Sequence, residues 1–481
     1  MTAPAAPGAW EPVIGLEVHC ELRTATKLFC GCRNAFGDEP NTNICPVCLG
    51  LPGSLPVVNA TAVEYAMRLG TALHCEIRSS LFHRKNYFYP DMPKDYQISQ
   101  YDEPLNVNGW LELPDGSRVG IERAHMEEDT GKTTHVGGGG RIHGADYSLV
   151  DYNRAGVPLV EIVSRPDIRS AAQARMYAAE LRGILVATGA SDGRMEEGSM
   201  RVDANVSVRR PGDPLGTRCE IKNLNSLRSL VRAIEYEIER QIDVLDTGGV
   251  VLQQTRHWDE DAGRTSALRS KEEAFDYRYF PEPDLVRVDP DSAWQADVAA
   301  AVGAMPADRR AALTALLGSD GPSPARADQI STVVEHGLDT LMTTAVEAGV
   351  GAALALARTA NEASAEPERA REVDPAAYSA LLRMEQEGTL SATQAKVVLG
   401  DLLLHGGEPA DLARARGFEA LAEDFLVGVI DELVAAHPDE WERYRAGDDK
   451  LTGYFTGLAM HATDKKANGK AVAAELRRRR G

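Results

Sequence analysis

Four cysteines near the N-terminus have the spacing of a metal-binding knuckle. Cys30-x-Cys32 is followed, after twelve residues, by Cys45-x-x-Cys48, with prolines and glycines nearby that favour turns. Four thiolates gathered in this way suit tetrahedral zinc, and a site closed by four protein ligands is structural rather than catalytic. The alternative is four reduced thiols in a loop. We expect a structural zinc knuckle at residues 30–48.

A second candidate metal site begins in the first strand. Apolar and polar residues alternate over Val13–Leu22, which predicts a half-buried strand. Glu17 and His19 share its polar side, with Cα atoms roughly 7 Å apart, and can converge on one divalent cation. Considered alone, this strand is better explained by a solvated polar face.

Two more carboxylate patterns favour a cation. His125-Met-Glu127-Glu128-Asp129 crowds three acids together, and like charges repel unless a cation offsets them. Glu161 interrupts the apolar run at residues 157–163, which predicts a buried strand. Since an isolated buried charge is costly, we expect Glu161 either to bind metal or to form a buried salt bridge.

The segment 83–96 is basic and aromatic within an acidic chain. It places Lys85 and Lys94 among four aromatic side chains. Such residues can neutralise phosphate or stack on bases. A proline-rich surface loop with packed aromatic rings is an equally good interpretation of the segment alone.

A further alternating strand is expected at residues 201–209. One of its faces is polar and could form the floor of a cleft.

The elements that must position these residues fall into an α+β part and a helical part. In this chain of 481 residues, the alternating segments end near residue 290. Beyond that point the sequence is rich in Ala, Leu, Glu and Arg at helical spacing. Amphipathic helices with serine caps are expected at 170–188 and 226–246, and a break at 405–407. We predict domains at 1–295, 296–405 and 406–481.

Charge excludes a generally basic nucleic-acid-binding protein but leaves room for a local basic site. The net charge is −20, yet residues 450–481 contain eight basic and two acidic side chains. The end of the chain could contact a nucleic-acid backbone, although a solvated helical terminus is the default. We find no export leader and no run of eighteen apolar residues, so we expect a cytoplasmic protein without a membrane partner.

Long motifs in this order resemble one family, the B subunit of aspartyl/glutamyl-tRNA amidotransferase, or GatB. The resemblance runs from Pro12 to near the C-terminus. It rests on residues 13–19 (VIGLEVH), 84–91 (RKNYFYPD), 97–100 (QISQ), 125–129 (HMEED), 195–205 (MEEGSMRVDAN) and 276–284 (DYRYFPEPD).

The resemblance implies a cradle-shaped catalytic domain similar to the glutamine synthetase catalytic fold, then an all-helical domain and a small helical tail that binds tRNA. It implies a ligase that forms C–N bonds with glutamine as amide donor, in a heterotrimer with a glutaminase partner, the A subunit, and with a small C subunit. ATP phosphorylates the side-chain carboxylate of Asp-tRNA(Asn) or Glu-tRNA(Gln), and channelled ammonia then displaces phosphate. This chain has no Ser-rich amidase motif, so a partner must supply the ammonia.

The resemblance also implies roles for residues. The expected catalytic residues are Lys85, Lys94 and Glu128, which neutralise phosphate or line the ammonia route. Zinc is expected to have a structural role rather than a chemical one. The expected Mg²⁺ ligands, with Mn²⁺ able to substitute, are Glu17, His19, Glu128 and Glu161, with Glu127 beside them; the expected tRNA contacts are Lys465, Lys466, Lys470 and Arg477.

Two alternatives from other classes stay open. A non-catalytic tRNA-binding adaptor with a zinc knuckle predicts that the carboxylates and His19 are scattered, solvated or salt-bridged. A free-standing ATP-dependent ligase for a small molecule leaves the basic helical tail unexplained. The related GatE proteins share the motifs but carry a large inserted domain, for which this chain has no room.

Overall fold

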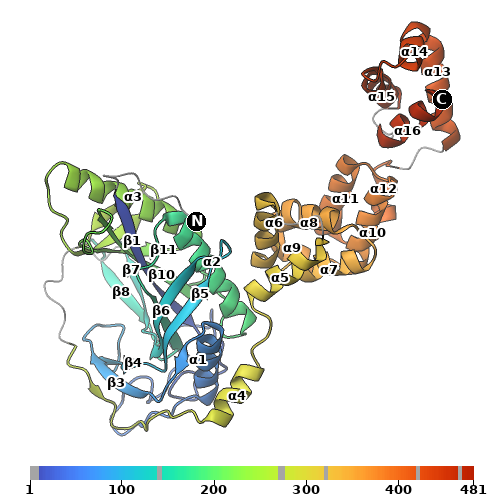
Figure 1. Ribbon diagram of the computed structural model, residues 1–481. Helices are drawn as coiled ribbons and strands as arrows, with labels where there is room; N and C mark the ends of the chain where they lie inside the picture. The colour runs from blue at the N-terminus through green and yellow to red at the C-terminus, as the bar shows by residue number, and fades with distance from the viewer. Residues whose placement is uncertain are drawn as a thin grey trace. The chain divides into compact units, whose positions relative to one another are not determined.

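The computed structural model describes residues 10–137, 144–268, 277–318, 323–418, 423–463 and 469–480. Its chain contacts divide into two compact units, Met1–Ala307 and Asp308–Gly481. The first unit contains strands and helices, and the second is helical (Figure 1). The expected α+β part followed by a helical part is therefore confirmed at this level.

The first unit is built on a mixed sheet of twelve strands among the described residues, antiparallel except between β11 and β12. A separate hairpin joins β7 (Lys132–Val136) to β8 (Tyr147–Asp151). The main strand order is β13 (Arg264–Ala267), β12 (Gln254–Asp259), β11 (Cys219–Leu224), β10 (Met200–Arg209), β1 (Glu11–Glu21), β9 (Pro158–Ser164), β6 (Arg118–Glu128), β4 (Tyr96–Glu103), β3 (Leu81–Asn86) and β14 (Phe280–Pro281), with β5 (Asn106–Glu112) on β6 and β2 (Glu76–Ile77) on β5.

Strand β1 has the predicted alternation. Ile14, Leu16 and Val18 are fully buried in the core cluster, while Glu17 and His19 on the other face are only partly covered. β10 alternates in the same way, with Val202, Ala204, Val206 and Val208 buried. The two central strands therefore give the sheet one apolar face and one polar face.

Helices cover the apolar face. α1 (Ala60–Ala72), α2 (Ala171–Ala187) and α3 (Leu227–Asp246) contribute side chains to the same core cluster as β1, and α4 (Ser292–Ala300) packs on α1 (Figure 1). The predicted caps are confirmed, because Ser170 accepts a hydrogen bond from the Gln173 amide and Ser226 from the Ser229 amide. Because these helices pack on the apolar face, the candidate site residues of β1 lie on the opposite, polar face of the sheet.

The second unit contains two separate hydrophobic clusters, one within residues 313–413 and one within 430–476. α11 ends at the predicted break, where Gly406 and Gly407 have φ of 64° and 102°. α12 beyond the break packs on α10 and α11. The helices are α5 (Pro306–Leu316), α6 (Pro324–Glu335), α7 (Asp339–Glu347), α8 (Ala352–Asn361), η3 (Ala363–Ala365), α9 (Pro367–Glu372), α10 (Pro375–Gln386), α11 (Ala392–His405), α12 (Pro409–Ala415), α13 (Glu423–Ala436), α14 (Pro438–Arg445), α15 (Leu451–Ala462) and α16 (Gly469–Arg480).

The domain boundaries expected at 295/296 and 405/406 stay predictions.

Among the helices of the described ranges, none combines the length and the apolar character needed to cross a membrane.

Candidate active site

Three side chains form a row across the polar face of the sheet. His19 on β1 lies opposite Glu161 on β9, and Glu161 lies opposite His125 on β6. Directly opposed residues on antiparallel strands have Cβ atoms about 5 Å apart. Backbone register therefore brings His19 together with two residues that lie more than 100 positions after it in the sequence.

Glu127 completes a group that can hold a cation. One donor atom from each of His19, Glu127 and Glu161 lies within 4.8 Å of the others. His19 Nε2 is 3.8 Å from Glu161 Oε2 and 3.9 Å from Glu127 Oε1. Two carboxylates beside an imidazole suit Mg²⁺ or Mn²⁺, because magnesium usually takes one or two protein carboxylates and fills its other positions with water and phosphate.

The electrostatics of this group favour an added positive charge. Burial, then the neighbouring Glu161, raises the pKa of Glu127 to about 8, although Lys85 opposes the shift. Burial also lowers the pKa of His19. Each shift favours the neutral form of its own side chain, whereas a divalent cation would favour the ionised carboxylate and the neutral imidazole.

His125 lies beside Glu161 in the same row. Its side chain is fully buried, and neither ring nitrogen has a hydrogen-bond partner among the residues that the structure describes. Nε2 is 3.4 Å from Glu161 Oε2, and burial holds the pKa of the ring well below its ordinary value. A neutral imidazole thus lies against the carboxylate that the strand pattern singled out.

The structure separates Glu17 and Glu128 from this group in different ways. Glu17 is two residues from His19 and accepts a hydrogen bond of 2.9 Å from Asn205 Nδ2. Burial, and next the charge of Glu161, raises the pKa of Glu17, so it borders the site. Glu128 instead binds Lys94, whose Nζ is 2.6 Å from Oε2. This geometry gives no support to Glu128 as a magnesium ligand, which stays a prediction.

The two lysines have different surroundings. Lys94 and Glu128 form a buried ion pair, and the backbone amide of Ile98 also donates to Glu128 Oε1 at 2.9 Å. Lys85 has its Nζ 4.7 Å from the centre of the Tyr277 ring, and its charge favours the ionised form of Glu127. Lys85 therefore borders the cation group, whereas Lys94 belongs to the pair with Glu128.

Aromatic rings lie at the border of the site near Lys85. Tyr101 and Tyr279 stack with ring centres 5.3 Å apart, and Tyr101 meets His125 edge-on at 6.2 Å. On another edge, Arg201 Nη2 donates to Asp129 Oδ2 at 2.8 Å. The polar face is thus bordered by aromatic rings and by a partly exposed guanidinium.

The four predicted zinc ligands come together. Their Sγ atoms all lie within 4.8 Å of one another, and those of Cys45 and Cys48 are 3.9 Å apart. Zinc bound to four thiolates at about 2.3 Å places the sulfurs about 3.8 Å apart. Hydrogen bonding from the Cys30 thiol, helped by the Cys45 amide and the charge of Lys27, lowers the pKa of Cys48 to about 5. The donor set fits zinc.

The predicted tRNA contacts lie only partly within the described residues. Lys465 and Lys466 lie outside them, as does the side chain of Lys470. Arg477 is exposed on α16 and forms no ion pair within the described part of the chain. The next three arginines do: Arg478 and Arg479 pair with Glu475, Arg479 also pairs with Asp431, and Arg480 pairs with Asp449.

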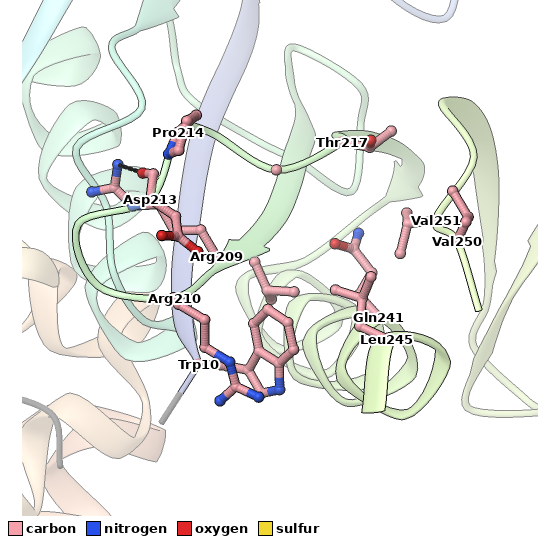
Figure 2. Close-up of a pocket in the computed structure, with 12 residues that line it drawn as sticks. Trp10, Arg209, Arg210, Asp213, Pro214, Thr217, Gln241, Leu245, Val250 and Val251 are labelled. Carbon is pink, nitrogen blue, oxygen red and sulfur yellow. Dashed lines mark hydrogen bonds between the residues drawn. The ribbon is translucent and has the colours of Figure 1, made fainter. Parts of the chain in front are cut away.

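A cavity of about 350 Å³ has none of the cation group in its lining. Figure 2 shows the residues that line it. It is lined by the end of β10, α3 and Trp10, on which the Arg210 guanidinium packs at 3.8 Å. Trp10 precedes His19 by nine residues, or about 30 Å along an extended strand. This cavity is not part of the site.

Comparison with known proteins agrees with the motifs. Residues 12–296 match the family model described as the GatB/GatE catalytic domain, and residues 344–479 match the one described as the GatB domain. The chain belongs to the GatB family. The residues matched to the GatB/GatE catalytic domain include the cation group, the Lys94–Glu128 pair and the cysteine knuckle.

Relatives in the GatB family match nearly the full chain. The B subunit of aspartyl/glutamyl-tRNA(Asn/Gln) amidotransferase from Frankia casuarinae is 49% identical over 98% of this chain and 96% of its own. The proteins of the same name from Thermobifida fusca and a Mycobacterium species are 47% and 48% identical over 95% and 97% of this chain, and 92% and 95% of their own.

Sequence reasoning underrates two residues of the GatB site. It treats Glu127 only as a neighbour of the ligands, and His125 only as part of a motif. Their spacing of two on one strand is the available signal, because it places both on the same face.

Proposed function

We propose that this chain is the B subunit of a tRNA-dependent amidotransferase that uses ATP to activate the side-chain carboxylate of Asp-tRNA(Asn) or Glu-tRNA(Gln). The names of its relatives support the substrate class. The observation that carries the chemistry is the group of His19, Glu127 and Glu161. The polar face of the sheet would be the floor of a cradle of the glutamine synthetase type.

The reaction needs activation because a carboxylate is a poor electrophile. A carboxylate oxygen of the substrate attacks the γ-phosphorus of ATP, the bond to the bridging oxygen breaks, and ADP leaves. Ammonia then attacks the carbonyl carbon of the acyl phosphate. The C–O bond breaks, phosphate leaves with its electron pair, and the new amide nitrogen loses a proton. The products are Asn-tRNA(Asn) or Gln-tRNA(Gln).

The first step brings two anions together, so it needs positive charge where they meet. His19, Glu127 and Glu161 would hold Mg²⁺, with Glu17 beside them, and the bound ion would supply charge stabilisation to the triphosphate. Lys85 adds a cation at the same edge, next to Tyr277. Neutral His125 packs beside Glu161 without adding a competing positive charge.

The second step needs ammonia rather than ammonium. We propose that Lys94 and Glu128 line the route by which ammonia arrives from the glutaminase partner, the A subunit. Their ion pair is buried, with side-chain exposures of 7% and 2%. Such a buried pair would shield the route from bulk water, where ammonia is protonated to unreactive ammonium. The small C subunit would complete the heterotrimer.

The remaining parts would serve binding and folding. Zinc in the cysteine knuckle would be structural, since four thiolates leave no open position. Arg477, with Lys465, Lys466 and Lys470, would contact the tRNA backbone. An acidic chain can still bind tRNA where basic side chains meet phosphates. The cytoplasm, where aminoacyl-tRNAs are used, is the expected compartment.

The test is tRNA-dependent ADP formation by the purified trimer with Mg²⁺, ATP and ammonium chloride, which bypasses the glutaminase. The proposal predicts ADP and amidated aminoacyl-tRNA in equal amounts, and neither with uncharged tRNA. The adaptor alternative predicts no ADP that depends on misacylated tRNA, and that result would refute the enzymatic proposal.

A further inference from the structure

The turn after the second cysteine pair lies directly against Lys94. A Cβ atom added at Gly50 would be 2.6 Å from Lys94 Cγ and 3.1 Å from Lys94 Cα. Real Cβ contacts are essentially never as short as the first of these, so only glycine allows this approach. Gly50 also has φ of 67°, two residues after Cys48. The backbone of the knuckle therefore forms one wall around the Lys94 stem.

The other flank of the knuckle meets the Lys94 amine. Phe29 directly precedes Cys30, and its ring centre is 5.7 Å from Lys94 Nζ. Phe29 is 4% exposed and packs edge-on against Phe82 at 5.3 Å. Because this ring is held in the core, it fixes where the ammonium group can lie.

The Glu128 carboxylate lies near the same structure, beside Gly156. A Cβ atom at Gly156 would be 3.6 Å from Cys48 Cβ, 3.6 Å from Lys27 Cδ and 3.8 Å from Glu128 Oε2. Lys27 is fully buried and its Nζ donates to the Tyr152 carbonyl at 3.2 Å. Cys48 of the knuckle and the Glu128 carboxylate thus flank a single backbone position, Gly156.

We propose that the Cys30–Cys48 knuckle is a positioning element for the Lys94–Glu128 pair. A buried ion pair is stable only when its geometry is well held. Zinc would fold the knuckle loop, and the folded loop would place Gly50 and Phe29 around Lys94. The consequence for catalysis rests on the proposed role of the pair in ammonia delivery, whereas the geometric claim does not.

A pair of glycine variants tests the geometry. Gly50 and Gly53 both have positive φ, of 67° and 85°, but a Cβ at Gly53 meets no atom of the described residues within 4 Å. Substitution by alanine therefore strains the backbone at both positions. Only at Gly50 does the added methyl group collide with Lys94. The readout is the acetylation rate of the Lys94 amine in the purified trimer, measured by mass spectrometry with the zinc content.

We expect Gly50→Ala to raise the Lys94 labelling rate by about fivefold, and Gly53→Ala to leave it within about twofold. Zinc content should stay near one per chain in both variants. Equal labelling rates in the two variants would overturn the proposal. If Gly50→Ala does not fold, Phe29→Leu keeps an apolar side chain, removes the ring, and carries the same expectation.

Removing zinc gives the second arm. In chelator-treated trimer, or in Cys45→Ser, we expect faster Lys94 labelling and weaker ammonium-supported amide formation, with ADP formation retained. Unchanged Lys94 labelling after zinc loss would refute the positioning role. If wild-type trimer forms no tRNA-dependent ADP, the proposed function fails, while the labelling result still decides the positioning claim.

Discussion

Glu127 and Glu128 are neighbours in sequence whose carboxylates lie in different environments. Glu127 points to His19 and Glu161 on the polar face, whereas Glu128 binds Lys94 and the Ile98 amide. Successive side chains of a strand point to opposite faces, so one dipeptide contributes to two sites. We propose that Glu127 belongs to the cation group and that Glu128 belongs to the ammonia route.

Divalent-metal affinity should distinguish the two glutamates. Glu127→Gln removes an anionic ligand, so we expect Mn²⁺ to bind at least about tenfold more weakly. Glu128→Gln keeps all three ligand residues, and its Mn²⁺ affinity should stay within about twofold of wild type. Calorimetric titration of the purified trimer measures both. A larger loss in Glu128→Gln than in Glu127→Gln would contradict the assignment.

Zinc content should depend on the knuckle cysteines alone. We expect Cys45→Ser to lose most of its zinc and to have a lower melting temperature, because a structural zinc contributes directly to folding free energy. Cys75→Ser is the matched control, since Cys75 is a partly buried free thiol outside the group. Metal analysis of both variants checks this. Equal zinc in the two would show that the knuckle is not the zinc site.

Glu237 should be a large contributor to the stability of the first unit. Its carboxylate is fully buried and accepts hydrogen bonds from Arg240, Gln241 and Thr265, with Arg256 Nε at 3.3 Å. Breaking a buried ion pair leaves unpaired charge, so Glu237→Gln should lower the free energy of unfolding by about 3 kcal/mol. Denaturant unfolding followed by tryptophan fluorescence measures it.

The same residue predicts a pH dependence. Burial raises the pKa of Glu237, but hydrogen bonds from Arg240 and Gln241 outweigh it, so the pKa lies below its ordinary value of 4.5. A lowered pKa adds stability that is present above pH 4.5 and is lost as the pH falls through the folded-state pKa. Glu237→Gln should lack this component. Exposed Glu235 on the same helix is the control, and an equal effect of Glu235→Gln would contradict the prediction.

Arg477 and Arg479 should behave differently in tRNA binding. Arg477→Ala should weaken binding at low salt and reduce the slope of log affinity against log salt by about one. Arg479 is held by Glu475 and Asp431, so Arg479→Ala should mainly destabilise the C-terminal helices. Filter binding at several salt concentrations measures the slopes. A larger slope change for Arg479→Ala would contradict this division of roles.

Features that depend on local pattern can be predicted from the sequence. Alternation predicts β1 and β10, serine caps predict the starts of α2 and α3, and spacing predicts the cysteine group. Each of these depends on residues within one short segment, where period and spacing are set by backbone geometry.

Features that depend on pairing between distant segments could not be predicted. The register that places Glu161 between His19 and His125 is a property of three strands together. β6 has a register shift between Ile121 and Arg123, so counting alternation from its start does not tell which face Glu127 occupies. The ion pairs of Arg479 likewise depend on how α13 packs against α16.

The most direct test of the account uses the ammonium-supported reaction with misacylated tRNA in two variants of the trimer. The measured quantities are ADP and amidated aminoacyl-tRNA. We predict that Glu127→Gln makes neither product, because phosphorylation of the substrate carboxylate fails, and that Glu128→Gln still makes ADP but little amide. If Glu127→Gln keeps full ADP formation, or Glu128→Gln abolishes it, the division between cation group and ammonia route is wrong.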